Sequence, residues 1–547
     1  MLAVTLTCVL TLVITRSTFF GDTRFYEIDI ASYLVGRTPF ADLLDFGHLI
    51  WRPLGALLAF HRDAEYEITL VRVHVALLSL NLFASLACTW TLWALLRLTK
   101  KVTAGLSILV VAAFVSTNGF VNLSRSGSPW LPGLACVMLA CCFTLVAERR
   151  HRAGERVTSY WIAASLTTTL AVLLWVPYVL TVLPIISAGL LDRPDTPSWK
   201  TVRRAAIRVL PGAVLLVAIA YVWAICARHI SSGPELLAWI RHAEHGEARG
   251  TSIMRFFFGF PRSFFIMGDA GIVWKQFLFH DPFARGTLLD VAAAGTWILA
   301  LFYGTLAVGG WFFLRDRDFR GTAFWAAVGV VPTIALAVLF EAGSVERYLA
   351  LYPMVFVVIG LLLSSARTQR PLRLLLVVLL VVQMSNNLYA NFRPRIDRES
   401  AALLQRIAPL ENRPGGATVY VVNLNDKLSA LYDGPEYATR SDLPQVTLLV
   451  PVLYPDIPKW RAIFAKSAED RWAAGGEVWI SRRAWAAQPL PQWHWVENDD
   501  PRIHWADIHN FAIHLDTDAE AGGDDGFLRV ANTLANRNRI LIAASLP

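Results

Sequence analysis

The chain has 547 residues, of which 55% are hydrophobic and only 17% are charged. The apolar residues come in runs of roughly 15 to 25, the length that a membrane-spanning helix requires, and the charged residues lie between the runs. This pattern excludes an ordinary soluble domain, in which apolar residues are fewer and more dispersed. It predicts a polytopic α-helical membrane protein.

The net charge of +8 is spread unevenly along the chain. Up to Ala390 there are 33 Lys and Arg against 22 Asp and Glu, whereas from Asn391 onward there are 17 against 20. A basic excess confined to the apolar part is typical of the positive-inside rule and does not indicate nucleic-acid binding. All six cysteines lie in hydrophobic runs, so the sequence predicts neither a disulfide framework nor a zinc site.

About eleven membrane spans are expected before Ala390. We expect the first as a retained helix, because it has no basic n-region and no small-residue cleavage site. Between Tyr160 and Leu191 the pattern fits either one long helix or two helices that turn at the sequence WVPY. With two, the spans cover approximately residues 1–18, 68–96, 102–120, 131–147, 159–174, 176–191, 208–229, 288–314, 322–341, 348–365 and 373–390.

Charge in the connections decides between these two readings. Five connections, RLTKK, ERRHRAGER, DRPDTPSWKTVRR to Arg208, RDRDFR and RTQRPLR, hold 18 Lys and Arg. They fall on one side of the membrane only if the Tyr160–Leu191 region crosses twice. We therefore expect them in the cytoplasm of an inner (plasma) membrane protein, with loops 19–67 and 230–287 and the C-terminal region outside.

Residues 391–547 are predicted to form a small extracytoplasmic α/β domain, separate from the membrane domain 1–390. The segments ATVYVVNLN, TLLVPVLYP, EVWISRRAW and RILIAASL are bounded by Gly, Pro and Asn and are expected as strands. The segment RESAALLQRIAPL is expected as an amphipathic helix.

Charged and aromatic side chains are predicted at the outer ends of several helices. The stretch GDTRFYEIDIASYLVG is expected to be helical, and the seven-residue spacing of its two aspartates would place them on one face. A second group lies where the chain returns to the membrane at GHLIWRPL, and a third opens a late span at ERYLALYP. The candidate site residues in these stretches are Asp22, Asp29, His48, Arg52, Arg347 and Tyr348.

These three stretches resemble the GT-C superfamily of integral-membrane glycosyltransferases, especially its family 39-like members. In that family the first outer loop carries an acid followed by Arg-Tyr and Ala-Glu-Ile, and RPLGALL resembles a later Lys/His-Pro-Pro-Leu element. The resemblance implies a GT-C-like fold, with Asp22 as the catalytic acid. It also implies that Arg52 and Arg347 stand at positions that bind a phosphate.

The chain departs from the family pattern at two places. The double proline is reduced to Pro53, and the second outer loop, STNGFVNLSRSGSPW, holds no acid. Arg125 in that loop is a third candidate phosphate ligand. No metal site is assigned, and a divalent metal remains possible under the resemblance.

The resemblance implies an inverting transfer of a sugar from a polyprenyl-phosphate donor to a glycan, lipid or protein acceptor. Such a donor carries a good leaving group, so one carboxylate acting as base is sufficient. Two alternatives stay open. A lipid-linked glycan ligase would depend on His48 or His280, and a transporter or assembly scaffold would need charges inside the spans. Only Arg72 and His74 lie well inside an expected span.

Overall fold

The computed structural model is divided into two units, one of residues 1–244, 251–268 and 295–394 and one of 245–250, 269–294 and 395–547. The described residues are 2–14, 23–61, 66–192, 198–242, 253–266, 297–316, 319–340, 344–365, 368–392, 405–421, 445–448, 457–485, 501–523 and 526–545. Each unit is described by itself.

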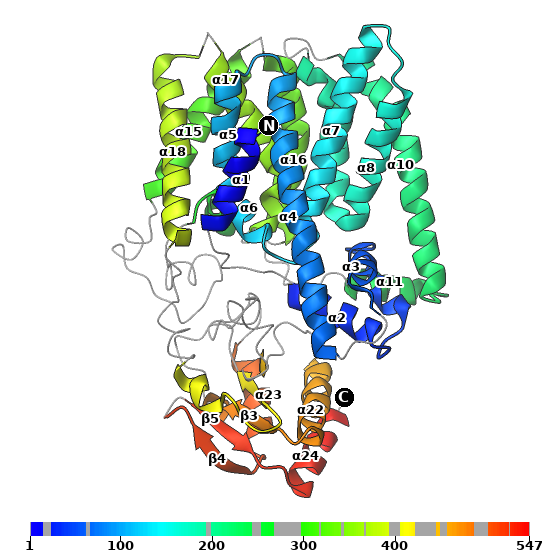
Figure 1. The fold of residues 1–547 in the computed structure, drawn as a ribbon, viewed down its shortest axis with the longest axis vertical. Helices are drawn as coiled ribbons and strands as arrows, with labels where there is room; N and C mark the ends of the chain where they lie inside the picture. The colour runs from blue at the N-terminus through cyan, green and yellow to red at the C-terminus, as the bar shows by residue number, and fades with distance from the viewer. Residues whose placement is uncertain are drawn as a thin grey trace. The chain divides into compact units, whose positions relative to one another are not determined.

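The first unit is a bundle of apolar helices (Figure 1). Seven helical segments are long and apolar enough to cross a membrane: α4 (Tyr66–Leu98), α7 (Trp130–Arg152), α10 (Trp199–Ala227), α15 (Trp297–Arg315), α16 (Arg320–Phe340), η5 (Glu346–Leu351) with α17 (Tyr352–Ser364), and α18 (Arg370–Phe392). Shorter apolar segments are α1 (Leu2–Ile14), α5 (Ala104–Val115), α8 (Thr158–Leu174), and the run η2 (Val176–Thr181), α9 (Val182–Ser187) and η3 (Ala188–Asp192). Each of the eleven expected spans overlaps one of these segments, so the expected class of a multi-helix membrane protein is confirmed.

The Tyr160–Leu191 region forms two helical passes. Helix α8 ends at Trp175, whose backbone is extended, with φ −156° and ψ 110°. The next segment starts beside the first turn of α7, where Tyr178 Oη donates to the Trp130 carbonyl over 2.6 Å. It ends beside the last turn of α7, where Arg149 Nε donates to Asp192 over 2.9 Å. Residues 176–192 therefore run parallel to α7 along its length, after α8 has returned from the far end.

Helix α4 is longer than a membrane crossing needs. Its 33 residues span about 50 Å at 1.5 Å per residue, against a hydrocarbon layer of about 30 Å. Its first turns pack on two helices of the first loop, α2 (Thr23–Leu34) and α3 (Trp51–Ala59), as Figure 1 shows. The expected helix in this loop is thus confirmed at Thr23–Leu34. The buried residues shared by the three helices are Tyr26, Ile30, Ala31, Trp51, Ala56, Ala59, Leu70, Val73 and Leu77.

Loop 230–287 contains an aromatic helix, α12 (Ile253–Phe264). Side-chain amides hold the C-terminal end of this helix. Carbonyls at a helix end have no partner within the helix and need one elsewhere. Here Asn118 Nδ2 donates to the Arg262 carbonyl over 2.7 Å, and Asn387 Nδ2 donates to the Phe264 carbonyl over 2.6 Å. Asn118 lies on the short helix α6 (Asn118–Leu123), so the second loop packs against α12.

The second unit contains a five-stranded mixed sheet in the order β2-β1-β3-β5-β4. Its strands are β1 (Ala417–Val421), β2 (Gln445–Leu448), β3 (Glu477–Ser481), β4 (Thr517–Ala521) and β5 (Phe527–Val530). Strand β1 is parallel to both β2 and β3, whereas β5 is antiparallel to β3 and β4. A buried core joins one sheet face to α22 (Ile457–Ala473), α23 (Pro501–Ala512) and α24 (Leu534–Ser545). The expected small α/β fold is confirmed.

One expected strand of this unit is wrong. The segment RILIAASL belongs to helix α24, which begins after Thr533, a residue whose Oγ1 accepts from Asn536 N over 3.1 Å. Asn536 and Ile540 are buried while Ile542 is exposed, which is the four-residue spacing of one helix face. The β-rich composition of the segment predicted a strand, whereas the cap at Thr533 begins a helix. Strands β4 and β5 were not predicted; they pair through the polar stretch TDAEA.

Because the chain crosses twice between α7 and α10, Glu155 and Glu235 are predicted to lie on opposite sides of the membrane. Glu155 lies in the turn after α7 and Glu235 in α11 (Gly233–His242), three passes later. Cysteines placed at these positions, in a Cys226→Ser background, are expected to react with a membrane-impermeant maleimide from opposite sides. From the positive-inside rule we expect Glu155 to be labelled from the cytoplasmic side. Labelling of both from the same side would contradict the two-pass arrangement.

Candidate active site around helices α2 and α3

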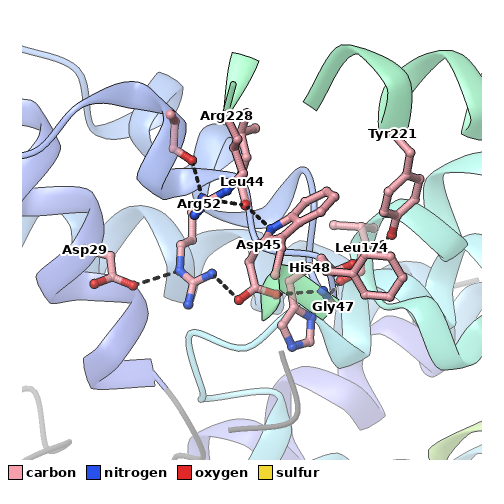
Figure 2. Close-up of polar contacts among 12 residues, drawn as sticks. Asp29, Leu44, Asp45, Gly47, His48, Arg52, Leu174, Tyr221 and Arg228 are labelled. Carbon is pink, nitrogen blue, oxygen red and sulfur yellow. Dashed lines mark hydrogen bonds and ion pairs between the residues drawn. The ribbon is translucent and has the colours of Figure 1, made fainter. Parts of the chain in front are cut away.

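Arg52 lies at the centre of a buried group of charges at the start of α3. Its Nε is 3.0 Å from Asp29 Oδ2 and its Nη1 is 3.0 Å from Asp45 Oδ2, as Figure 2 shows. The guanidinium also lies 5.1 Å from the ring centre of Tyr26, within the range of a cation–π contact. The Arg52 side chain is 6% exposed, so two carboxylates balance its charge away from water.

Asp45 is the residue of this group that the sequence analysis missed. It follows η1 (Phe40–Leu43), is buried, and its Oδ1 accepts from Gly47 N over 2.7 Å. An Asp that bonds the backbone two residues later forms a local turn, and the sequence DFG contains that signal. Burial by itself lowers the pKa of Arg52, but Asp45 and then Asp29 raise it by more, so the pKa lies above its ordinary value.

His48 connects this turn to the break in the α8 pass. Its Nδ1 lies 3.1 Å from the Leu174 carbonyl oxygen, so Nδ1 carries the proton and donates. Two backbone bonds continue the connection, from Ile50 N to the Leu173 carbonyl over 3.3 Å and from Val176 N to the Gly47 carbonyl over 3.1 Å. The extended backbone at Trp175 thus supplies partners for the turn that carries Arg52.

Arg347 and Tyr348 lie on η5 and make different contacts. The Arg347 guanidinium carbon is 5.8 Å from the ring centre of Trp175. Tyr348 is fully buried, with its ring centre 5.4 Å from that of Phe260 on α12. The late-span stretch therefore contacts the Trp175 ring, and the first-loop stretch bonds the backbone on both sides of that residue, although some 300 residues separate the two stretches in the sequence.

The second loop reaches the start of α2. Thr23, the first residue of α2, accepts from Gly127 N over 2.7 Å, and Trp51 Nε1 donates to the Gly127 carbonyl over 2.8 Å. A side chain on Gly127 would lie 2.7 Å from Thr23 Cγ2, so glycine permits this close approach. Arg125, two residues earlier, is partly exposed.

Asp22 lies outside the described residues, as does His280, and the structure does not place either. Of the remaining candidates, Asp29, His48 and Arg52 belong to one group, and Arg347 contacts Trp175, the residue after the His48 partner Leu174. Tyr348 instead faces the phenylalanines of α12. Within the described ranges, no group of three or more His, Cys, Asp or Glu residues is arranged to hold a metal ion.

Neither a family model nor a curated protein matches the chain. Several solved structures are similar to it. ArnT from Cupriavidus metallidurans bound to undecaprenyl phosphate has 11% identity and a TM-score of 0.46, covering 97% of both chains. The archaeal oligosaccharyltransferase AglB from Archaeoglobus fulgidus, in complex with an inhibitory peptide and a dolichol-phosphate, has 12% identity and a TM-score of 0.45, covering 97% of this chain and 74% of that one.

A third similar structure is the mycobacterial arabinofuranosyltransferase AftD, with 16% identity and a TM-score of 0.37, covering 88% of this chain and 35% of that one. At these identities and TM-scores the similarities assign neither a family nor an activity. The expected family 39-like membership stays a prediction.

Substitution of the two Arg52 partners is expected to have unequal effects on stability. Asp45→Asn leaves a buried guanidinium short of one charge and should lower the free energy of unfolding by about 3 kcal/mol. Asp29 is 45% exposed, so Asp29→Asn should cost about 1 kcal/mol or less. Chemical denaturation of the detergent-solubilised variants measures both values. Equal losses would contradict a network centred on Asp45.

Proposed function

We propose that the chain is a membrane glycosyltransferase of the GT-C type that moves a sugar from a polyprenyl-phosphate donor to an extracytoplasmic acceptor. The observation that carries this proposal concerns the break in the α8 pass: the turn before Arg52 bonds the backbone on both sides of Trp175, and Arg347 lies against the Trp175 ring. Two of the three stretches that resemble this superfamily, GHLIWRPL and ERYLALYP, thus both contact the segment around Trp175, although they are distant in sequence. The acceptor class, a glycan, lipid or protein, is left open.

The proposed reaction is a single inverting displacement. The acceptor hydroxyl oxygen attacks the anomeric carbon, the bond from that carbon to the phosphate oxygen breaks, and the phosphate leaves with the electron pair. Asp22 takes the hydroxyl proton as general base. A glycoside hydrolase would instead use two carboxyl groups at a defined separation across the sugar.

We assign different parts to the candidate arginines. Negative charge develops on the leaving phosphate, and the planar guanidinium binds two phosphate oxygens at once. Arg347 beside Trp175 is the proposed phosphate ligand, and Arg125 is a second candidate. Arg52 is already balanced by Asp29 and Asp45, so we assign it the part of ordering the loop between α2 and α3.

The rival functions find less support in the described contacts. A ligase dependent on His48 would need its imidazole exposed to substrate, but this side chain is buried and bonded to the Leu174 carbonyl. A transporter would need unmatched charges along a path, whereas His74 is paired with Glu27 on the neighbouring helix.

Incubation of the purified protein with a panel of radiolabelled polyprenyl-phosphate sugars and membrane extracts tests the proposed function. We expect one donor to lose its sugar to an acceptor. Asp22→Asn should reduce that transfer by about 100-fold or more, because a general base contributes 10²–10⁴-fold. Asp42→Asn, an exposed acid of the same loop, is the matched control and should keep full activity. An active Asp22→Asn enzyme would contradict the mechanism.

Arg347 is expected to act on the donor phosphate. Arg347→Ala should lower kcat/KM by about 100-fold, and Arg347→Lys should recover only part of this, because an ammonium cannot bind two oxygens in the same way. Arg315 lies 5.2 Å from the ring centre of Trp311 in α15 and offers a matched arginine–tryptophan pair. Steady-state kinetics of Arg315→Ala should match the unsubstituted protein. Full recovery in Arg347→Lys would argue against phosphate binding through the guanidinium.

A further inference from the structure

A buried acid–histidine pair joins α2 to α4, and the proposed reaction does not use it. Glu27 Oε1 lies 2.5 Å from His74 Nδ1, with 3% and 5% of the two side chains exposed. Apolar residues of both helices surround the pair, among them Ile30, Leu70 and Val73. In the described part of the chain, His74 Nε2 has no hydrogen-bond partner.

Stability does not explain such a pair. Replacing both partners of a buried hydrogen-bonded pair by apolar groups of similar shape is often neutral or stabilising, since removing both polar groups from water is costly. Apolar contacts are also non-directional, so the cluster around Tyr26 and Leu77 defines the register of α2 on α4 less sharply than a polar bond does. A short hydrogen bond between one oxygen and one nitrogen does not permit such a shift. The pair therefore contributes a defined position.

That position bears on the proposed catalytic base. Asp22 is the residue before Thr23, where α2 begins, and Glu27 is one helical turn further on. Thr23 is itself bonded to Gly127 N over 2.7 Å. The first turn of α2 is thus fixed at its beginning by the second loop and at its end by α4. Misplacement of a catalytic group by about 1 Å can reduce a rate by about 100-fold.

We infer that His74 is a positioning residue, which through Glu27 holds α2 in one register on α4, and with it Thr23, the residue that follows Asp22 in the sequence. This inference rests on the proposed function for its catalytic part. Its structural part, the fixing of α2 by the Nδ1 bond, can be tested without any substrate.

Two amide substitutions separate this role from general packing. Asn places its amide nitrogen near the position of histidine Nδ1, whereas Gln places its amide nitrogen near Nε2. His74→Asn should therefore keep the bond to Glu27, and His74→Gln and His74→Leu should lose it. Thr89→Val is the matched control, because Thr89 is buried on the same helix as His74 and its Oγ1 donates to the Ser85 carbonyl over 2.6 Å, several turns beyond the contact with α2.

The experiment measures hydrogen–deuterium exchange of the α2 peptide and steady-state kinetics with the donor found in the panel. His74→Leu and His74→Gln should exchange faster in residues 23–34 and lose kcat by about 10- to 100-fold, with KM for the donor changed less than about twofold. His74→Asn and Thr89→Val should stay within about threefold of the unsubstituted kcat.

Equal behaviour of His74→Asn and His74→Gln, or unchanged exchange in α2 for all variants, would overturn the inference. If no donor is turned over by the unsubstituted protein, the proposed function fails, and the exchange data alone still decide whether the pair fixes α2. Faster exchange in α2 with unchanged kcat would show that the pair orders the helix without positioning Asp22.

Discussion

The extended backbone at Trp175 is the constraint on which the arrangement of the site depends. A helix that continued through this residue would leave no unbonded groups at Leu173, Leu174 and Val176 for the first loop. The break exposes these groups, and the turn that carries His48 and Arg52 uses them. The same residue offers its ring to Arg347. The break at Trp175 therefore has two consequences. It begins the second pass, residues 176–192, and it provides the contacts of the first-loop turn.

Buried charge is the second feature that organises this part of the molecule. Two separate groups occur within a few turns of each other, Arg52 with its two carboxylates and Glu27 with His74. Polar and charged side chains are costly to remove from water, and each is tolerated here because its partner lies within about 3 Å. Both groups include a residue of α2. The helix that follows Asp22 is thus the element on which most of the local electrostatic interactions converge.

The fold was largely predictable, because long apolar runs and basic connections are strong and independent signals. At WVPY, hydrophobic periodicity fits either one long helix or two helices. The charge of the connecting loops favours two helices, which is what the structure has. Local composition misled the prediction at RILIAASL, where the cap at Thr533 outweighs β-rich residues. The polar strand β4 carried no apolar alternation by which it could be found.

The candidate site was only partly predictable. Sequence patterns select residue types, so Asp29, His48 and Arg52 could be named as a group. Sequence patterns do not reveal which side chains balance a buried charge. Asp45 was therefore not predicted, although its distance from the Arg52 guanidinium, 3.0 Å, equals that of Asp29. The pairing of Glu27 with His74 joins two helices 47 positions apart, and no short motif records such a contact.

The amide anchors at the end of α12 have a different character from these charged groups. Asn118, Asn386 and Asn387 hold that end through neutral hydrogen bonds to backbone carbonyls. Carboxamides do not titrate, and salt screens their dipoles far less than it screens separated ions. A change of ionic strength that weakens the charged contacts of α2 would leave this attachment as it is. The attachments of α2 and α12 thus differ in their sensitivity to the salt concentration of the medium.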